Sequence, residues 1–526
     1  MNMAAQLQKL PLGIQDFEKL RTENALYVDK TRLVYDMVQQ GGCYFLSRPR
    51  RFGKSLLMST IQAYYEGKKE LFDGTIGQRL AIADKEDVTW EAHPVLHLDL
   101  NTQKYDSPEK LDDVLNAFLN NAEEIYGRKE WEVGFGLRFE GIIERAYQKW
   151  NHRVVILIDE YDKPLLESIL NPELQAQYRA TLKGFYGALK SKDGCIKFAL
   201  LTGVTRFSKV SIFSGLNNLN DISMVRQYSD ICGITEQELR DNFGPCVERL
   251  AQANGLTCDE CLDKLRTRYD GYHFHQNASG IYNPFSLLKT FITQDFGSYW
   301  FETGTPSYLV QLLQQHDYNL EEMSHAVASS DVLGSIDATA QDPIPVLYQS
   351  GYLTIKGYDR EFGLYELGFP NEEVEEGFVK YLEPFYTSRN PVKSSFDLRN
   401  FVLDVRAGRT EQFVKRLRSL FADTPYELVR KLENHYQNVL WLLFKLMGFY
   451  VQAEYHTSEG RIDLVLQTPG YCYVLEFKLD GTAEEALAQI SDRSYTLPFE
   501  LSGQKIIRIG MNFSSTTRNI ERYVIA

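Results

Sequence analysis

The stretch Arg48-Pro-Arg-Arg-Phe-Gly-Lys-Ser55 lies between an apolar run, Cys43–Leu46, and a helical pattern of apolar residues that begins at Leu56. This order predicts a strand, a tight loop and a helix, which is the layout of a phosphate-binding loop. Backbone N–H groups at the start of the helix would hold a polyphosphate, Lys54 would bridge its outer phosphates, and the Ser55 hydroxyl would hold Mg²⁺. We therefore expect a nucleoside triphosphate to bind here.

The first glycine of the GxxxxGK[ST] pattern is replaced by Arg48. A basic turn before a helix is therefore an alternative to a phosphate-binding loop. The arginines of this stretch form the densest positive patch of the chain, which favours phosphate binding within the loop itself. On this interpretation Arg48, Arg51, Phe52 and Gly53 also belong to the nucleotide site.

Two acidic residues, Asp159 and Glu160, follow directly after the apolar run Val154–Ile158. An uninterrupted apolar run of this length is typical of a buried strand in a parallel sheet. Carboxylates at the tip of such a strand suit the Walker B role, in which Asp159 holds Mg²⁺ and Glu160 polarises the attacking water. Two solvated carboxylates after a core strand are the alternative.

Strand candidates alternate with long helical patterns in the first half of the chain, which indicates a parallel, doubly wound sheet. Strands are expected at Cys43–Leu46, Pro94–Leu100, Val154–Ile158 and Ile196–Leu201, and helices at Leu111–Tyr126 and Leu174–Lys190. After the last of these strands, Thr202 would sense the γ-phosphate and Arg206 would pair with it. A structural arginine at 206 is an equal alternative.

The C-terminal region holds a second group of charged residues. Two strand patterns flank Pro469-Gly470, and a reversal of the chain there places Asp463 directly opposite Glu476. Because side chains alternate along strands, Asp463, Glu476 and Lys478 share one face, whereas the other face is wholly apolar. Pro-Gly favours a type II turn, so a register shifted by two residues stays open.

Two facing carboxylates repel each other unless a divalent cation, Mg²⁺ or Mn²⁺, lies between them. Asp463 and Glu476 are therefore predicted metal ligands, and Lys478 would orient or deprotonate a water for phosphodiester hydrolysis. Glu433 is a predicted further ligand, because it lies on the apolar stripe of the preceding helix. Gln489, on the following helix, would reach the same site. The alternative for Asp463, Glu476 and Lys478 is a set of cross-strand ion pairs on a solvated face. The alternative for Glu433 is a carboxylate that the helix dipole favours at the start of its helix.

The composition is that of an ordinary globular protein. Its 526 residues suggest about three domains. The longest apolar runs are strand-sized and the first residues lack the layout of a signal peptide, so we expect a cytoplasmic protein with no membrane partner. The net charge of −14 excludes a broadly basic nucleic-acid coat, so any contact with DNA or RNA must be local. The scattered cysteines fit reduced thiols.

Taken together, these strings resemble a family of bacterial AAA-ATPase-like proteins. The likeness in the N-terminal part is carried by Leu10–Phe17, Tyr27–Thr31, Arg48–Ser55, Ile158–Lys163 and Thr202–Ser208. The sequence of residues 48–55 is this family's own form of the phosphate loop, so Arg48 is not a local loss. The C-terminal strings that contain Asp463, Glu476 and Gln489 resemble the associated PD-(D/E)XK nuclease superfamily domain.

The resemblance implies an α/β protein with a P-loop NTPase core of AAA-like parallel sheet, a helical lid, a mixed connector and a restriction-endonuclease-like α/β domain. The expected bounds are 1–230 for the core, 231–301 for the lid, 302–430 for the connector and 431–526 for the nuclease-like domain. The implied cofactors are ATP and Mg²⁺, with Mn²⁺ as an alternative at the second site. The nucleotide and DNA or RNA are the expected partners, and a homo-oligomer is an open alternative.

Three functions are compatible with these features. In the first, ATP hydrolysis gates a Mg²⁺-dependent nuclease that acts in defence or DNA processing. In the second, the ATPase is a molecular switch whose C-terminal domain binds nucleic acid or a protein without cleaving it. In the third, both sites are relics on an interaction scaffold. The complete set of charged residues at both sites favours the first function.

Overall fold

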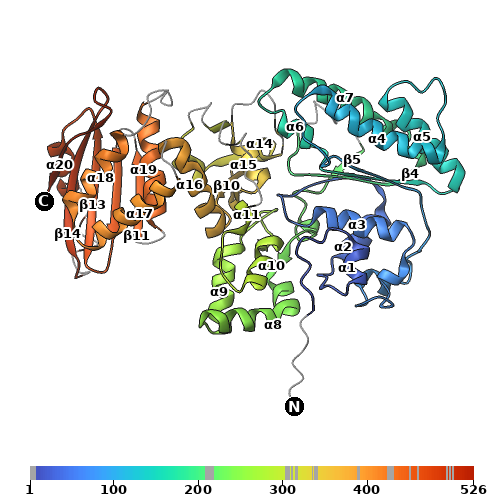
Figure 1. Cartoon of the computed structure of the whole chain (residues 1–526), viewed down its shortest axis with the longest axis horizontal. Coiled ribbons are helices and arrows are strands. Elements are labelled where there is room, and N and C mark those ends of the chain that lie inside the picture. The colour runs from blue at the N-terminus through green and yellow to red at the C-terminus, as the bar shows by residue number, and fades with distance from the viewer. Residues whose placement is uncertain are drawn as a thin grey trace, which may run out of the picture. The chain divides into compact units, whose positions relative to one another are not determined.

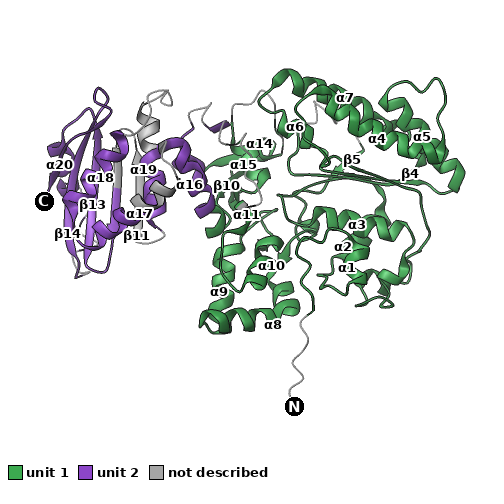
Figure 2. Cartoon of the chain, in the orientation of Figure 1, with its two compact units in different colours: residues 1–309, 325–374 green, residues 310–324, 375–526 purple. Residues whose placement is uncertain are grey.

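The chain divides into two compact units (Figure 2). Unit 1 comprises residues 1–309 and 325–374, and unit 2 comprises residues 310–324 and 375–526. The predicted connector, 302–430, is thus shared between the two units. The structure is a computed structural model that describes residues 8–207, 218–302, 309, 312–313, 318–334, 336, 342–387, 391–422, 432–448, 452–458, 461–492, 496, 499 and 503–526. None of the helices within these ranges is long and apolar enough to cross a membrane.

Unit 1 is built on a five-stranded parallel sheet in the order β2-β3-β4-β1-β5. The strands are β1 (Gly42–Ser47), β2 (Val95–Asp99), β3 (Val154–Asp159), β4 (Ile196–Gly203) and β5 (Leu219–Asp221). The four predicted strands are confirmed. The sequence does not predict β5, because its three residues carry no apolar run.

Helices cover both faces of this sheet, as a doubly wound fold requires. Figure 1 shows α4, α5 and α7 on one face and α1, α2 and α3 on the other. The two predicted helices are confirmed as α4 and α7. The bounds are α1 (Phe17–Thr22), α2 (Thr31–Gln40), α3 (Lys54–Tyr65), α4 (Pro108–Tyr126), α5 (Phe135–Trp150), α6 (Lys163–Glu167) and α7 (Pro172–Ser191), with short 3-10 turns η1 (Lys69–Leu71), η2 (Ala81–Asp84), η3 (Asp193–Cys195) and η4 (Arg226–Tyr228).

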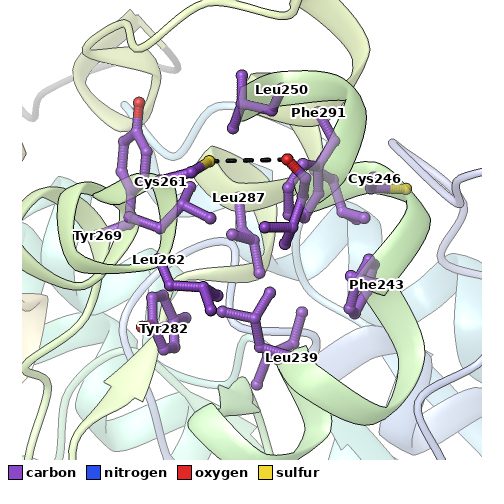
Figure 3. Close-up of a cluster of buried hydrophobic side chains, with 14 of the residues drawn as sticks. Leu239, Phe243, Cys246, Leu250, Cys261, Leu262, Tyr269, Tyr282, Leu287 and Phe291 are labelled. Atoms are coloured by element: carbon purple, nitrogen blue, oxygen red, sulfur yellow. Dashed lines mark hydrogen bonds between the residues drawn. The ribbon is translucent and has the colours of Figure 1, made fainter. Parts of the chain in front are cut away.

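A helical subdomain follows the sheet, where the sequence predicts a lid. Its elements are β6 (Ile234–Thr235), α8 (Glu236–Asn254), α9 (Cys258–Tyr269), β7 (Ile281–Tyr282), α10 (Pro284–Thr293) and α11 (Tyr299–Glu302). Capping boxes at Thr235 and Thr257 fix the starts of α8 and α9. The helices meet in the apolar cluster of Figure 3, where the buried Cys261 thiol donates to the Val247 carbonyl.

The remainder of unit 1 is a small antiparallel sheet in the order β8-β10-β9 with two short helices. Its bounds are β8 (Val327–Ser329), α14 (Ser330–Leu333), α15 (Ile344–Ser350), β9 (Thr354–Asp359) and β10 (Leu364–Gly368). Helix α16 (Glu372–Thr387) begins in unit 1 and continues into unit 2. Its buried Glu373 accepts hydrogen bonds from Ser286 and from the backbone of Tyr299 and Trp300, which ties α16 to the helical subdomain.

Unit 2 is built on a five-stranded mixed sheet in the order β11-β12-β13-β14-β15. Only β13 and β14 are parallel neighbours. The elements are α13 (Leu320–Ser324), α17 (Pro391–Arg406), α18 (Thr410–Ala422), α19 (Leu432–Gly448), β11 (Gln452–Ser458), β12 (Arg461–Gln467), β13 (Tyr471–Leu479), α20 (Ala483–Asp492), β14 (Lys505–Ser514) and β15 (Asn519–Ile525). The predicted order of helix, hairpin, helix and strand is confirmed.

Candidate functional site

The phosphate loop runs from the end of β1 to the start of α3, as the sequence predicts. Arg51 and Gly53 have left-handed backbones, with φ of 67° and 95°, which turn the chain before Lys54 begins α3. Glycine adopts this conformation without strain, so the turn gives position 53 a backbone reason to be glycine. Among the described residues no side chain caps α3, so the N–H groups of its first turn can bind an anion.

Lys54 folds back over the loop. Its ammonium group is buried and donates to the carbonyl oxygens of Arg48, at 2.9 Å, and Pro49, at 3.2 Å. These carbonyls are neutral acceptors, and a phosphate oxygen carries negative charge. Charged acceptors form the stronger bonds with an ammonium group, so a phosphate can replace these carbonyls as the partner of Lys54.

Asp159 joins the ends of three neighbouring strands. Its Oδ2 accepts a hydrogen bond from Ser55 Oγ at 2.6 Å, and its Oδ1 accepts from Thr202 Oγ1 and from the Glu160 backbone. Asp159 is only 4% exposed. A hydroxyl and a carboxylate in contact are the oxygen donors that Mg²⁺ prefers, so these side chains fit the ion that the sequence predicts.

Glu160 directly follows β3 with a left-handed backbone, φ 50°, which is unusual for a residue other than glycine. Burial raises the pKa of its carboxyl group, and the positive charge of Lys54 opposes that rise. The side chain lines the cavity described below. A carboxylate held in this way can accept a hydrogen bond, and then a proton, from a water molecule.

Asp162 is a supporting residue to which sequence reasoning assigned no role. It is fully buried and accepts hydrogen bonds from the backbone of Val204 and from the backbone and hydroxyl of Thr205. Burial raises its pKa, although these donors favour the ionised form. A Cβ at Gly203 would overlap Asp162, so glycine is needed there. The sequence feature that could have indicated this role is the position of Asp162 as the second aspartate in the stretch Ile158–Lys163.

A cavity of about 500 Å³ opens in front of the phosphate loop. Six residues of the loop, Arg50 to Ser55, line its polar end together with Glu160 and Lys163. The other walls come from the N-terminal segment, the region before β6 and helix α10; they comprise residues 11–15, Leu26, Val28, Ile231, Ile234, Phe285 and Leu288. This volume and this mixture of apolar wall and charged end suit a nucleotide.

The apolar walls were missed by sequence reasoning. The N-terminal segment carried only the family likeness, and nothing local marks Phe285 as a wall residue. The Arg51 guanidinium lies 4.9 Å from the centre of the Phe285 ring, which links the loop to α10. Lys30 pairs with Glu238 at 2.6 Å and holds the N-terminal segment against α8.

Two arginines that the sequence assigns to the nucleotide site, Arg48 and Arg206, are not among the residues that line this cavity. The buried Arg48 guanidinium donates to the carbonyls of Ser47, Ser223 and Tyr228 and stacks on Phe274. Through these hydrogen bonds Arg48 ties the start of the loop to the segment around Ser223 and Tyr228. Its predicted role at the nucleotide stays a prediction.

Arg206 makes the contacts expected of a structural arginine, which is the alternative that the sequence left open. Its guanidinium forms an ion pair with Asp221 at the end of β5, and its backbone N–H donates to Gln349. Both partners lie beside a separate small cavity, of about 40 Å³. A role at the γ-phosphate would require this ion pair to open.

The second predicted site lies on the hairpin of β12 and β13. The register is the predicted one, with Asp463 opposite Glu476. The predicted apolar face is buried, as Leu464, Leu475 and Phe477 show. The side chains of Asp463 and of Glu433, which lies in the first turn of α19, are outside the described residues.

Lys478 connects Glu476 with α20. Its Nζ lies 3.8 Å from Glu476 Oε1 and 2.5 Å from Gln489 Oε1. Glu476 has no exposed surface. Three of the predicted side chains therefore lie together. The same face is not wholly polar, however, because Cys472 and Val474 pack there against Ile490 of α20 in a small core.

The comparisons with known proteins match two separate regions of the chain. Residues 11–213 match the family described as "Predicted AAA-ATPase", and residues 431–523 match the "PD-(D/E)XK nuclease superfamily". A relative described as "Uncharacterized protein in vnfD 5'region", from Azotobacter chroococcum mcd 1, is 34% identical over 98% of this chain and 99% of its own length. The identity thus spans both matched regions. The chain belongs to the family of AAA-ATPase-like proteins that carry a C-terminal PD-(D/E)XK nuclease superfamily domain.

Proposed function

We propose that the chain hydrolyses ATP at the phosphate loop and that this hydrolysis controls a metal-dependent nuclease in unit 2. The observation that carries the first part is the contact of Ser55 Oγ with Asp159 Oδ2, beside Lys54 and Glu160 at the wall of the cavity. The two members of this contact come from the first turn of α3 and the end of β3, and both are residue types that nucleotide hydrolysis uses.

Each group has a defined task in this proposal. The apolar wall holds the base, and the N–H groups of the first turn of α3 hold the phosphates. Lys54 exchanges the carbonyls of Arg48 and Pro49 for phosphate oxygens. Mg²⁺, when bound through Ser55 and Asp159, neutralises charge that develops on the phosphates. Glu160 orients the attacking water and accepts its proton.

In unit 2, Asp463 and Glu476 would hold Mg²⁺ or Mn²⁺, which stabilises the charge of a phosphodiester under attack. Glu433 is a further proposed ligand. Lys478 would orient the attacking water, and Gln489 positions Lys478 through the hydrogen bond between them. The facing positions of Asp463 and Glu476 support this assignment.

A second candidate function is a switch whose C-terminal domain binds nucleic acid or a protein without cleaving it. The observation that favours it is the complete burial of Glu476. A carboxylate without exposed surface can bind an ion only after its surroundings open. The burial of Glu476 therefore favours a C-terminal domain that binds without cleaving.

Phosphate release by the full chain with Mg²⁺ and ATP tests the ATPase proposal. We expect Lys54→Ala to abolish turnover and weaken ATP binding. Glu160→Gln should keep binding but lose turnover, because it keeps the shape but not the base. Lys69→Ala, in the η1 turn, is a matched control and should behave as the unchanged chain. Full turnover in both site variants would refute the proposal.

A further inference from the structure

Two histidines and a glutamate meet at the amino-terminal edge of the unit 1 sheet. Glu91 and His93 precede β2, and His152 precedes β3, its direct neighbour. One potential ligand atom from each residue lies within 4.8 Å of the other two. All strands of this sheet are parallel, so this edge is opposite to the one at which Ser55 and Asp159 meet. The cluster is therefore separate from the nucleotide site.

The two imidazole rings are held in matching orientations. His93 Nδ1 lies 2.8 Å from the carbonyl oxygen of Arg153, and His152 Nδ1 lies 2.9 Å from that of Ala92. A carbonyl only accepts, so each Nδ1 carries the proton and donates it. Each Nε2 then carries a lone pair. This is the tautomer in which histidine binds a metal, with its other nitrogen donating to a carbonyl.

The backbone on both sides of the cluster is fixed as well. His93 N–H donates to the Tyr65 carbonyl at 2.7 Å, and Val155 N–H donates to the Pro94 carbonyl at 2.9 Å. The Tyr65 ring meets the His93 ring edge-on, with centroids 5.5 Å apart. The ring centroids of His93 and His152 are 5.2 Å apart. The ligand atoms are thus positioned by the fold itself.

Burial favours the neutral form of the His93 imidazole. Burial lowers the pKa of His93, and the nearby His152 and Lys197 act in the same direction, whereas the hydrogen bond to the Arg153 carbonyl and the charge of Glu91 oppose the shift. A neutral ring is the form that binds a metal. Glu91 is exposed and the two histidines are half-buried, so an ion can reach the cluster from solvent.

We propose that Glu91, His93 and His152 bind a divalent transition-metal ion of the Zn²⁺ type through one carboxylate oxygen and the two Nε2 atoms. Imidazole nitrogen suits Zn²⁺ and its neighbours, whereas Mg²⁺ and Ca²⁺ prefer sites made of oxygen. Three protein ligands leave a fourth position for water. The ion links the segment before β2 to the segment before β3 and so stabilises two adjacent strands of the ATPase core.

A Zn²⁺ titration of the full chain, freed of metal and competing with a chromophoric chelator, tests this site. Loss of an outer-shell partner alone costs about 10–100-fold in metal affinity, so His152→Gln, which removes a ligand, should weaken binding by roughly 100-fold or more. Glu91→Gln changes an exposed residue and should weaken it less. His97→Gln, an exposed histidine on β2, is the matched control and should bind as the unchanged chain.

Two further measurements separate this site from other metal-binding groups. With Co²⁺, the spectrum should show ligand-field bands without the intense near-ultraviolet band of thiolate ligands, which excludes the exposed Cys258. Glu476→Gln should leave the high-affinity site intact. The metal-free variants should melt at the same temperature as the metal-free unchanged chain. Equal Zn²⁺ affinity in His152→Gln and the unchanged chain, a thiolate band, or loss of the site only in Glu476→Gln would overturn the proposal.

Discussion

The Ser55 hydroxyl donates a hydrogen bond to the Asp159 carboxylate across 2.6 Å, which joins the first turn of α3, after β1, to the tip of β3. The same carboxylate accepts a hydrogen bond from Thr202 on β4, which lies between these two strands. One buried aspartate thus links β3, β4 and the start of α3 by hydrogen bonds at the edge of the sheet where the cavity opens. A change at any of the three positions is expected to act on the others.

Ser55→Ala should remove the Mg²⁺ dependence of nucleotide binding, because it deletes the hydroxyl that is proposed to bind Mg²⁺ together with the Asp159 carboxylate. We expect Mg²⁺ to strengthen ATP binding to the unchanged chain and to have little effect on the variant, by calorimetry with and without Mg²⁺. Ser55→Thr keeps the hydroxyl and should restore the effect. An undiminished Mg²⁺ effect in Ser55→Ala would show that Ser55 is not a ligand.

Glu373→Gln should change how stability depends on pH. Burial raises the pKa of Glu373 to about 7 from an ordinary value of 4.5, although the hydrogen bonds from Ser286, Tyr299 and Trp300 oppose the shift. The native chain then keeps a proton that the unfolded chain loses. The contribution of Glu373 to the free energy of unfolding should therefore fall by roughly 3 kcal/mol as pH rises from about 4.5 to about 7, and stay level above.

The measurement for this prediction is the difference in free energy of unfolding between the unchanged chain and Glu373→Gln as a function of pH. Comparing variants removes the contributions of other buried carboxyl groups, such as Asp162. The exposed neighbour Glu372 supplies the control, because Glu372→Gln should leave the slope unchanged. Parallel curves for all three proteins would show that Glu373 is ionised in the native chain at neutral pH.

Sequence patterns predict those parts of both sites that lie on one strand or one hairpin. Apolar runs define β1, β3 and β4, and the site residues follow where each run ends. The hairpin register follows from the Pro469-Gly470 reversal together with alternation, and the pairing of Asp463 with Glu476 confirms it. These features depend on neighbours in sequence, which is why a single chain reveals them.

Roles that depend on distant partners could not be predicted. The Arg48 guanidinium donates to the carbonyls of Ser223 and Tyr228, and these residues are far away along the chain. The apolar wall of the cavity comes from the N-terminal segment, the region around β6 and helix α10, which are far apart along the chain. His93 and His152 likewise come from different segments and follow no spacing motif.

Gly510 on β14 pairs with Glu476 on the neighbouring strand β13. Its lack of a side chain lets α20 pack closely on the sheet. A Cβ at this position would overlap the backbone of Ala483 and Leu487 in α20. We expect Gly510→Ala to lower the free energy of unfolding by about 1–3 kcal/mol, as overpacking does. Gly470→Ala is the control, because a Cβ there meets open space. Equal melting temperatures for both variants would contradict the close packing of α20.

A fragment of residues 375–526 should melt cooperatively, whereas one of residues 425–526 should not. The shorter fragment begins near the predicted boundary but lacks α17 and α18. These helices pack on the sheet: the rings of Phe421 and Phe513 meet edge-on at 4.8 Å, and Tyr473 donates to the Val405 carbonyl. Circular dichroism during heating measures this. A cooperative melt of the shorter fragment would support the predicted boundary near residue 430.

If ATP hydrolysis in unit 1 controls metal-dependent cleavage in unit 2, the full chain should cleave nucleic acid only when it can turn over ATP. Cleavage of labelled DNA and RNA by the full chain with Mg²⁺ and ATP measures this. We predict cleavage by the unchanged chain that requires both Mg²⁺ and ATP. Asp463→Ala combined with Glu476→Ala should abolish cleavage and keep ATP turnover, and Lys54→Ala should abolish both. Cleavage that survives the double substitution, or that proceeds equally without ATP in Lys54→Ala, would contradict the account.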